Sequence, residues 1–195
     1  MLRAYLKSLI AALLLGAATS GATLAPAQAA SVLCTLSFGL AGCEEYKPSG
    51  EPSFYKSMAV TGAKVDAKAA ASMISGYRRN NGLGVISLDD TLMRMAEQQA
   101  LAMASKNRFE HDAAGPFAQR IKRSGYDAKV AVENIGAGYH TLAEAFSGWR
   151  DSPPHRANML HSGVTKMGIA AAYAPNTKYK VFWSLILAAP DDHRG

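Results

Sequence analysis

The chain has 195 residues, 49% hydrophobic residues and a formal net charge of +6, which is typical of one globular domain with an additional terminal segment. Arg3 and Lys7 lie close to the N-terminus, and removing these two charges lowers the net charge from +6 to +4. No basic run is longer than Arg78-Arg79. The sequence therefore predicts no nucleic-acid binding.

The first 30 residues have the pattern of an export signal. Arg3 and Lys7 provide a positive start, residues 9–18 form a short apolar centre, and "AQA" at residues 27–29 has the small side chains that a signal peptidase accepts. The apolar centre is too short to span a membrane comfortably. We therefore expect a signal peptide over residues 1–30 and a secreted or periplasmic protein.

A second interpretation comes from "LAGC", residues 40–43, which resembles a lipobox. In that case the signal extends to residue 42, and a lipid on Cys43 anchors the protein to the cell envelope. The chain has only two cysteines. If cleavage follows residue 30, Cys34 and Cys43 both remain and could pair in an oxidising compartment. We expect membrane attachment only through the leader or this lipid.

Residues 31–64 are interpreted as a linker because "EEYKPSGEPSFYKS" is polar and contains two prolines. The folded domain is predicted over residues 65–190, with a short tail at residues 191–195. "VDAKAAASMISGYRRNNGL" predicts the first helix, which ends near Gly82. "SLDD", residues 87–90, resembles a capping box that begins a second helix.

Apolar periodicity defines the next elements. The second helix has one apolar stripe, formed by Leu92, Ala96, Ala100 and Met103. A shorter helix is predicted over residues 117–125. "KVAVENIGAGY" predicts a strand followed by a glycine-rich loop, and "TLAEAFSGW" predicts another helix.

The C-terminal part changes to a period of two. "KMGIAAAY" and "YKVFWSLIL" alternate as two buried strands, and "APNTK" joins them as a hairpin. Helices followed by an antiparallel pair predict an α+β fold with helices packed on a small sheet.

Four motifs follow one another along the chain, namely "YRRNNGLGVISLDDTLMRMAEQQALAMASKNRFEH", "ENIGAG", "WRDSPPHRANML" and "MGIAAAY". In this order they resemble the CAP superfamily of cysteine-rich secretory, antigen 5 and pathogenesis-related 1 proteins, and most of all its bacterial SCP-like extracellular branch. The resemblance extends over about residues 74–188. It implies an α-β-α sandwich with a central antiparallel sheet flanked by helices. It also implies a cleft lined by histidines and glutamates, which holds a divalent metal in some members.

Carried over to this chain, the cleft residues are His111 of "FEH", Glu133 of "ENIG" and His155 of "SPPH". Many eukaryotic members have a second glutamate where this chain has Ser152, which puts a full set of four in doubt. Glu144 is a poor substitute, because Thr141 and Glu144 form a capping box and Glu144 should face solvent.

The residues themselves leave two interpretations of each side chain open. Ser152 and Pro153 favour a helix start, where the helix dipole keeps the imidazole of His155 neutral and able to bind a metal. A purely local hydrogen bond is the alternative. Glu133, in a strand, must be paired or bound, and Arg156 or backbone amides would satisfy it equally well.

His111, Glu133 and His155 are adequate as a three-ligand zinc site with an open position, and they are also the candidate catalytic residues for water activation. Asn134 and Ser152 could hydrogen-bond to these ligands. No metalloprotease signature is present. The sequence thus favours a monomeric, exported binding module for a metal, small lipid, peptide or envelope component. A zinc-assisted or metal-free hydrolase and a structural envelope protein with a vestigial cleft are the alternatives.

Overall fold

The computed structural model describes residues 32–34, 43–45 and 50–191 of the chain. Two compact units are distinguished, Met1–Ser49 and Gly50–Gly195. The predicted leader over residues 1–30 lies outside the described residues. Within the described part, no helix is long and apolar enough to cross a membrane.

The N-terminal unit contains one small antiparallel pair. Strands β1 (Val32–Cys34) and β2 (Cys43–Glu45) are paired so that Cys34 lies opposite Cys43. The disulfide and the lipid on Cys43 stay predictions, because only the backbone of these strands is described.

The second unit begins at Gly50, earlier than the predicted boundary at residue 65. A short 3-10 helix, η1 (Ser53–Tyr55), comes first. Met58 is only 7% exposed, and its N–H donates to the carbonyl of His140 at 2.6 Å. Residues 50–64 therefore pack on the domain instead of forming a linker, because a few apolar side chains within a polar segment reach the core.

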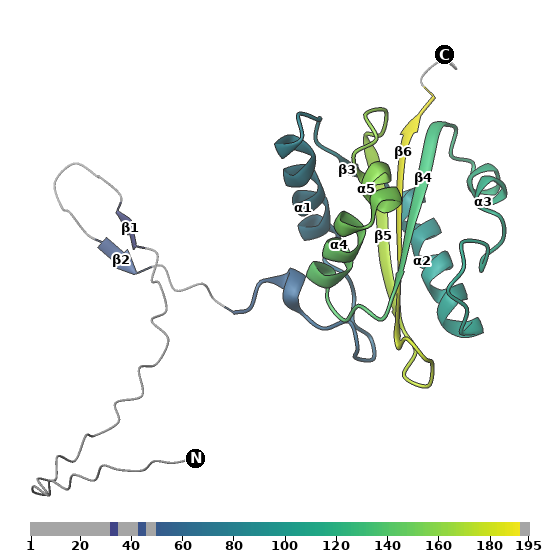
Figure 1. Ribbon diagram of the computed structural model, residues 1–195, viewed down its shortest axis with the longest axis horizontal. Helices are drawn as coiled ribbons and strands as arrows, with labels where there is room; N and C mark the ends of the chain where they lie inside the picture. Colours follow the sequence, from purple (N-terminus) through teal and green to yellow (C-terminus); the bar gives the residue numbers. More distant parts are fainter. Residues whose placement is uncertain (1–31, 35–42, 46–49, 192–195) are drawn as a thin grey trace, which may run out of the picture. The chain divides into compact units, whose positions relative to one another are not determined.

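Helices cover both faces of a central sheet (Figure 1). The helices are α1 (Ala67–Asn80), α2 (Asp90–Lys106), α3 (Phe117–Ser124), α4 (Leu142–Asp151) and α5 (Pro153–Met159). The helices α1, α4 and α5 pack on one face, and α2 and α3 pack on the other.

The sheet has four strands in the order β3-β5-β6-β4. The strands are β3 (Ser87–Leu88), β4 (Ala128–Ala137), β5 (Lys166–Tyr173) and β6 (Val181–Pro190). The three long strands are antiparallel, as predicted, and the predicted hairpin is the pair β5–β6. The short β3 runs parallel to β5 and makes the sheet mixed. The α-β-α sandwich and the α+β class are confirmed.

The start of α2 differs from the prediction. Residues 87 and 88 form β3, and the helix is capped by Asp89, whose Oδ1 accepts hydrogen bonds from the N–H groups of Thr91 at 2.9 Å and Leu92 at 3.0 Å. The "SLDD" motif therefore ends a strand and caps a helix within four residues. Asp and Ser are both strong N-cap residues, so the motif alone did not determine which residue caps.

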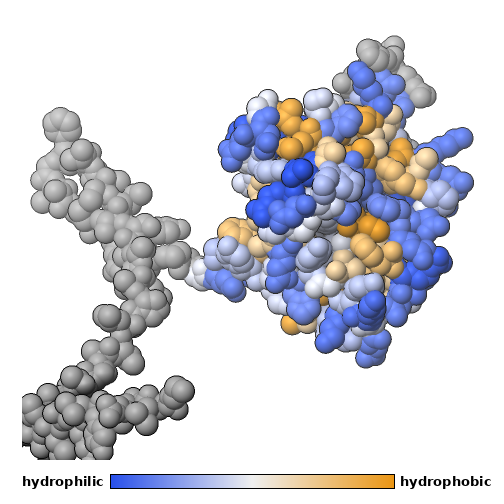
Figure 2. All heavy atoms as spheres, viewed as in Figure 1, coloured by the Kyte–Doolittle hydropathy of each residue, from blue (hydrophilic) through white to orange (hydrophobic). Residues whose placement is uncertain are grey.

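Strand β6 forms the centre of the core because both of its faces are buried. Trp183, Leu185 and Leu187 face the layer of α1, α4 and α5, whereas Ile186 and Ala188 face α2 and α3. The indole of Trp149 on α4 packs edge to face against that of Trp183, with 6.5 Å between the ring centroids. The surface in the same view is mostly hydrophilic, with scattered apolar patches (Figure 2).

Candidate functional site

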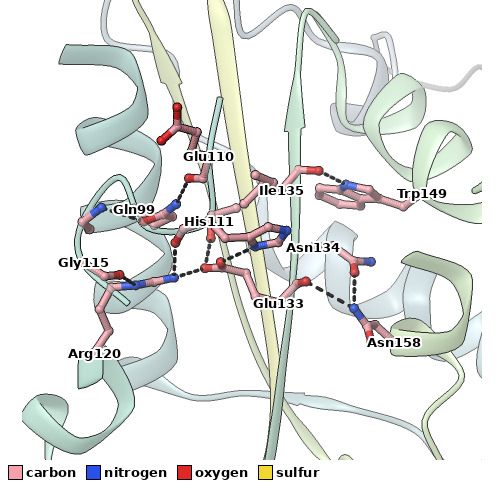
Figure 3. A network of polar contacts seen from close by, with 12 residues as sticks. Gln99, Glu110, His111, Gly115, Arg120, Glu133, Asn134, Ile135, Trp149 and Asn158 are labelled. Carbon is pink, nitrogen blue, oxygen red and sulfur yellow. Dashed lines mark hydrogen bonds and ion pairs between the residues drawn. The ribbon is translucent and has the colours of Figure 1, made fainter. Parts of the chain in front are cut away.

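Strand β4 lies at the edge of the sheet and carries the site on two successive residues. Side chains alternate between the two faces of a strand. Glu133 contacts α3 through Arg120, and Asn134 contacts α5 through the backbone of His155. The two helical layers therefore meet at this edge, with one polar side chain directed into each (Figure 3).

A buried ion pair holds Glu133. Its side chain is 2% exposed and that of Arg120 is 4% exposed, and Nη2 of Arg120 lies 2.7 Å from Oε1 of Glu133. The hydroxyl of Ser184 also approaches Oε1, at 3.4 Å. A buried carboxylate is stable only when it is paired and hydrogen-bonded, and Arg120 fulfils this requirement. The sequence suggested Arg156 for this role, but Arg156 is exposed on α5.

His111 completes a chain of three charged or polar groups (Figure 3). Its Nδ1 lies 2.9 Å from Oε2 of Glu133, and its side chain is 55% exposed. A carboxylate can only accept hydrogen bonds, so Nδ1 carries the proton in this pair. In the neutral ring, Nε2 is then an acceptor that can bind a metal or take a proton.

Hydrogen bonds from buried side chains hold the backbone of the loop that carries His111. Gln99 of α2 is fully buried; its Nε2 donates to the carbonyl of Glu110 at 2.8 Å, and its Oε1 accepts from the N–H of Ala114 at 3.1 Å. Arg120 Nη2 also donates to the carbonyl of His111 at 3.1 Å. The backbone on both sides of His111 is thus positioned by buried side chains.

His155 is the third residue of α5, as predicted, after Ser152 and Pro153. Ser152 occupies the N-cap position, although its side chain makes no capping hydrogen bond. Asn134 is buried and donates to the carbonyl of His155 at 2.9 Å. Burial lowers the pKa of His155, and the charge of nearby His111 lowers it further. His155 therefore favours the neutral form.

Asn158 ties α5 to the strand edge. Its Nδ2 donates to Oδ1 of Asn134 at 2.8 Å and lies 3.2 Å from the carbonyl oxygen of Glu133 (Figure 3). An unpaired carbonyl on an edge strand needs such a partner. Asn158, the asparagine of "HRAN", therefore fixes the position of α5, and with it His155, relative to Glu133 on β4.

The contacts of Glu133 disfavour its predicted role as a zinc ligand. Both oxygens of Glu133 are engaged, and a metal ion bound to this carboxylate would stand next to the positive charge of Arg120. Among the described residues, no group of three or more His, Cys, Asp or Glu side chains is arranged to hold a metal ion. Imidazole is a ligand type that zinc accepts, and the contact with Glu133 orients the ring of His111. Zinc binding itself stays a prediction.

The remaining side chains considered from the sequence lie outside this cluster. Glu144 is exposed and forms the predicted capping box with Thr141, and its Oε2 accepts from the N–H of His140 at 2.6 Å. Ser152 is half-buried between α4 and α5. The carboxylate of Glu144 is thus engaged in the helix cap, and Ser152 carries no carboxylate that could replace the second family glutamate.

Two hollows lie elsewhere on the domain. One, of about 280 Å³, lies between α2 and α3. The other, of about 590 Å³, runs between residues 60–65, α2 and strand β5. Neither is lined by His111, Glu133 or His155. The predicted residues thus lie at a strand edge and line neither of these two hollows, although Arg120, the partner of Glu133, lines the one between α2 and α3.

Three residues that organise the site were missed from the sequence, namely Gln99, Arg120 and Asn158. A signal existed for Arg120, because it shares one face of α3 with Phe117 and Ile121, and a charged residue in an apolar stripe indicates a buried partner. Gln99 likewise lies beside the apolar stripe of α2. Nothing in the sequence pairs Asn158 with β4.

Relatives of the chain were found by sequence. The chain is 31% identical to the uncharacterized protein YkwD of Bacillus subtilis over 105 residues, which cover 52% of this chain and 40% of that protein. An uncharacterized protein of Borreliella burgdorferi is 26% identical over 106 residues, covering 54% of this chain and 68% of that protein. The match to YkwD thus spans less than half of that protein.

Solved structures with the same fold were also found. An outer surface protein from Borrelia burgdorferi superposes with a TM-score of 0.58 at 20% identity, covering 67% of this chain and all of that chain (100%). An extracellular protein containing an SCP domain from Bacillus anthracis gives a TM-score of 0.55 at 24% identity, covering 62% of this chain and 39% of that chain. At these identities the likeness establishes the fold.

The family itself is identified by the match of its sequence model. This model, described as the cysteine-rich secretory protein family, CAP, matches residues 71–187, more than half of the chain. The matched region contains His111, Glu133 and His155. The chain therefore belongs to the CAP family, and its relatives include bacterial proteins of the SCP-like type.

Proposed function

We propose that this CAP domain is an extracytoplasmic binding module whose ligand is held by His111 and His155, with zinc as the first candidate. The observation that carries the proposal is the chain from buried Arg120 through Glu133 to the half-exposed imidazole of His111, whose charge also lowers the pKa of His155. A histidine that ligates a metal usually donates its other N–H to a carboxylate, which fixes the ring and raises its basicity.

The role of Glu133 in this proposal differs from that of a ligand. Glu133 holds Nδ1 of His111 and leaves Nε2 available, while His155 stays neutral because of burial and the neighbouring imidazole. Metal binding requires neutral imidazoles. Two protein ligands leave the remaining zinc positions to water or to a group of a bound molecule.

The proposed location outside the cytoplasm is supported by two observations of different kinds. The first 30 residues have the pattern of an export signal. Two structural relatives are described as an extracellular protein and an outer surface protein. Cleavage after residue 30 and a lipid on Cys43 are distinguished by the mass and the N-terminal sequence of the protein purified from its own host.

Calorimetric titration with zinc tests the proposed site. The full chain should bind zinc with micromolar affinity or better, and His111→Ala and His155→Ala should each abolish this binding. His140→Ala is the matched control, because His140 is exposed and, among the residues described, only its backbone takes part in hydrogen bonds. Absence of binding to the folded wild-type chain, or equal loss in the control, would remove the metal from the proposal.

A hydrolase is the second candidate, and one observation favours it. The pair of Glu133 and His111 resembles the orientation of a general base by a carboxylate, with Nε2 free to take a proton from water. In this case ester or peptide substrates should be turned over, and turnover should be lost in His111→Ala while circular dichroism shows an intact fold. A structural envelope protein would show neither zinc binding nor turnover.

A further inference from the structure

The cavity between α2 and α3 has a basic, hydrogen-bonding lining. Its polar residues are three arginines, one amide and two hydroxyls, namely Arg94, Arg120, Arg123, Gln98, Thr91 and Ser124. Among the residues that the structure describes, no carboxylate lines the cavity. Of the three guanidinium groups, that of Arg120 is paired with Glu133, and the other two repel one another unless an anion is present. The cavity therefore has the charge of an anion-binding site.

Two of the three charges are uncompensated. Arg94 and Arg123 form no ion pair among the residues that the structure describes. Arg94 Nη2 donates to the hydroxyl of Thr91 at 2.9 Å, and Arg123 Nη2 donates to the carbonyl of Ala114 at 3.3 Å. Both partners are neutral, so each guanidinium keeps its full positive charge and has further N–H donors available.

The third arginine contributes a buried donor. Arg120 uses Nε for the carbonyl of Gly115 and Nη2 for Glu133 and the carbonyl of His111. Its Nη1 is buried and has no hydrogen-bond partner within the described part of the chain. The ring of Phe117 lies 5.1 Å from Cζ and attracts the cation, but a ring is a much weaker acceptor than an oxygen. A buried N–H group normally has a partner.

We propose that this cavity binds a small oxyanion, namely phosphate or the phosphate group of a larger molecule. Guanidinium groups present forks of N–H donors that match phosphate oxygens, and the hydroxyls and the amide supply neutral donors. Arg120, which lines the cavity, also keeps one buried N–H donor, Nη1, without an acceptor in the described part of the chain. The volume of about 280 Å³ is just below the roughly 300–1,000 Å³ of typical organic-ligand pockets, which favours a single phosphate group.

Phosphate titration of the full chain tests the proposal, with sodium chloride replacing phosphate at constant ionic strength. Calorimetry and thermal unfolding should both report binding to the wild type. Arg94→Gln and Arg123→Gln should each weaken binding by about tenfold, because a charge-assisted hydrogen bond is lost. Both residues are exposed, so these variants should stay folded. Arg120 is left unchanged because it belongs to the buried ion pair.

Arg79→Gln is the matched control, because Arg79 is an exposed arginine on α1, in the opposite layer. The proposal requires this variant to bind phosphate like the wild type. Equal weakening in Arg79→Gln would show a general effect of net charge and would overturn the proposed site. No phosphate-specific binding to the wild type, together with no binding in the lipid arm, would overturn it as well.

A lipid arm identifies the source of the phosphate group. Vesicles of phosphatidylglycerol and of phosphatidylcholine are compared in flotation assays with the wild type and the Arg94→Gln/Arg123→Gln double variant. Binding to phosphatidylglycerol that the double variant loses and Arg79→Gln keeps supports a lipid headgroup. Binding of inorganic phosphate without vesicle binding supports a free phosphate or a soluble phosphate ester.

Discussion

Nδ1 of His111 and Oε2 of Glu133 lie 2.9 Å apart, although the two residues are 22 positions apart in the chain. One is half-exposed on a loop and the other is buried on β4. Because Arg120 holds the second oxygen of the same carboxylate, the orientation of the candidate ligand and the stability of the domain depend on one side chain. A substitution of Glu133 therefore affects both the orientation of His111 and the stability of the domain, and separate measurements distinguish the two effects.

Glu133→Gln is expected to destabilise the domain by about 3–5 kcal/mol, because it leaves the charge of Arg120 buried without its partner. Urea unfolding followed by circular dichroism measures this loss. If the variant remains folded, its zinc affinity should fall by about 10- to 100-fold through the lost orientation of His111, while both imidazoles remain.

A double variant provides the control for this ion pair. Glu133→Leu combined with Arg120→Met removes both charges, and apolar side chains of similar size often replace a buried pair at little cost. The double variant should therefore be more stable than Glu133→Gln alone. A double variant that is less stable than the single one would contradict the interpretation that the penalty comes from an unpaired buried charge.

His155 should titrate below its ordinary pKa of 6.5, because burial and the charge of His111 both disfavour the imidazolium form. Two-dimensional NMR of the histidine rings measures this directly. His111→Gln should raise the pKa of His155, since one of the two causes is removed, while the fold is retained. An unchanged pKa in His111→Gln would show that the imidazoles do not interact.

The same shift predicts a pH dependence of stability. The native pKa of His155 is lower than the unfolded value, so the unfolded chain binds a proton first. The contribution of His155 to the free energy of unfolding is fully present above pH 6.5. It is lost as the pH falls below 6.5 towards the native pKa. His155→Gln should flatten this part of the profile. Equal slopes in the wild type and the variant would argue against His155 as the titrating group.

The sequence predicted the elements that have clear periodicity. The α2 stripe that includes Leu92 and Met103 is buried as expected, and the C-terminal hairpin was recognised from its alternating strands. Strand β3 was missed because two residues cannot show a period. The segment before residue 65 was assigned to a linker because its few buried residues, such as Met58, stand among polar ones.

The candidate site was predictable only through the family resemblance. His111, Glu133 and His155 are each 22 residues apart, and such spacings do not specify a site by themselves. The contacts that hold them depend on packing between layers, which brings Arg120 of α3 to β4 and Asn158 of α5 to the same strand. Sequence patterns describe one element at a time, so partners on different elements remain hidden.

Arg78 is expected to be sensitive to substitution, because it is 1% exposed and, within the described part of the chain, its guanidinium donates only to backbone carbonyls. Its guanidinium donates to the carbonyls of Gly84, Met159, His161 and Val164 at 2.8–3.1 Å. Arg78→Met leaves these carbonyls without donors and should cost about 3 kcal/mol or more.

The neighbouring Arg79 is the control for Arg78. It is exposed, so Arg79→Met should change the free energy of unfolding by less than about 0.5 kcal/mol. Urea unfolding of both variants gives the comparison. Similar stabilities would mean that the carbonyls around Arg78 are satisfied by water instead.

Gly168→Ala is expected to destabilise the domain by about 1–3 kcal/mol or more through overpacking. Gly168 lies on β5 under the first turn of α2, and a Cβ there would overlap the backbone of Leu92, which cannot move aside like a side chain. Gly84→Ala is the matched control, since a Cβ at Gly84 meets no atom within 4 Å. Thermal unfolding should show a lower Tm for Gly168→Ala alone. A wild-type Tm in Gly168→Ala would mean that α2 can shift away from the sheet, and that the close approach of its first turn to β5 is not needed for stability.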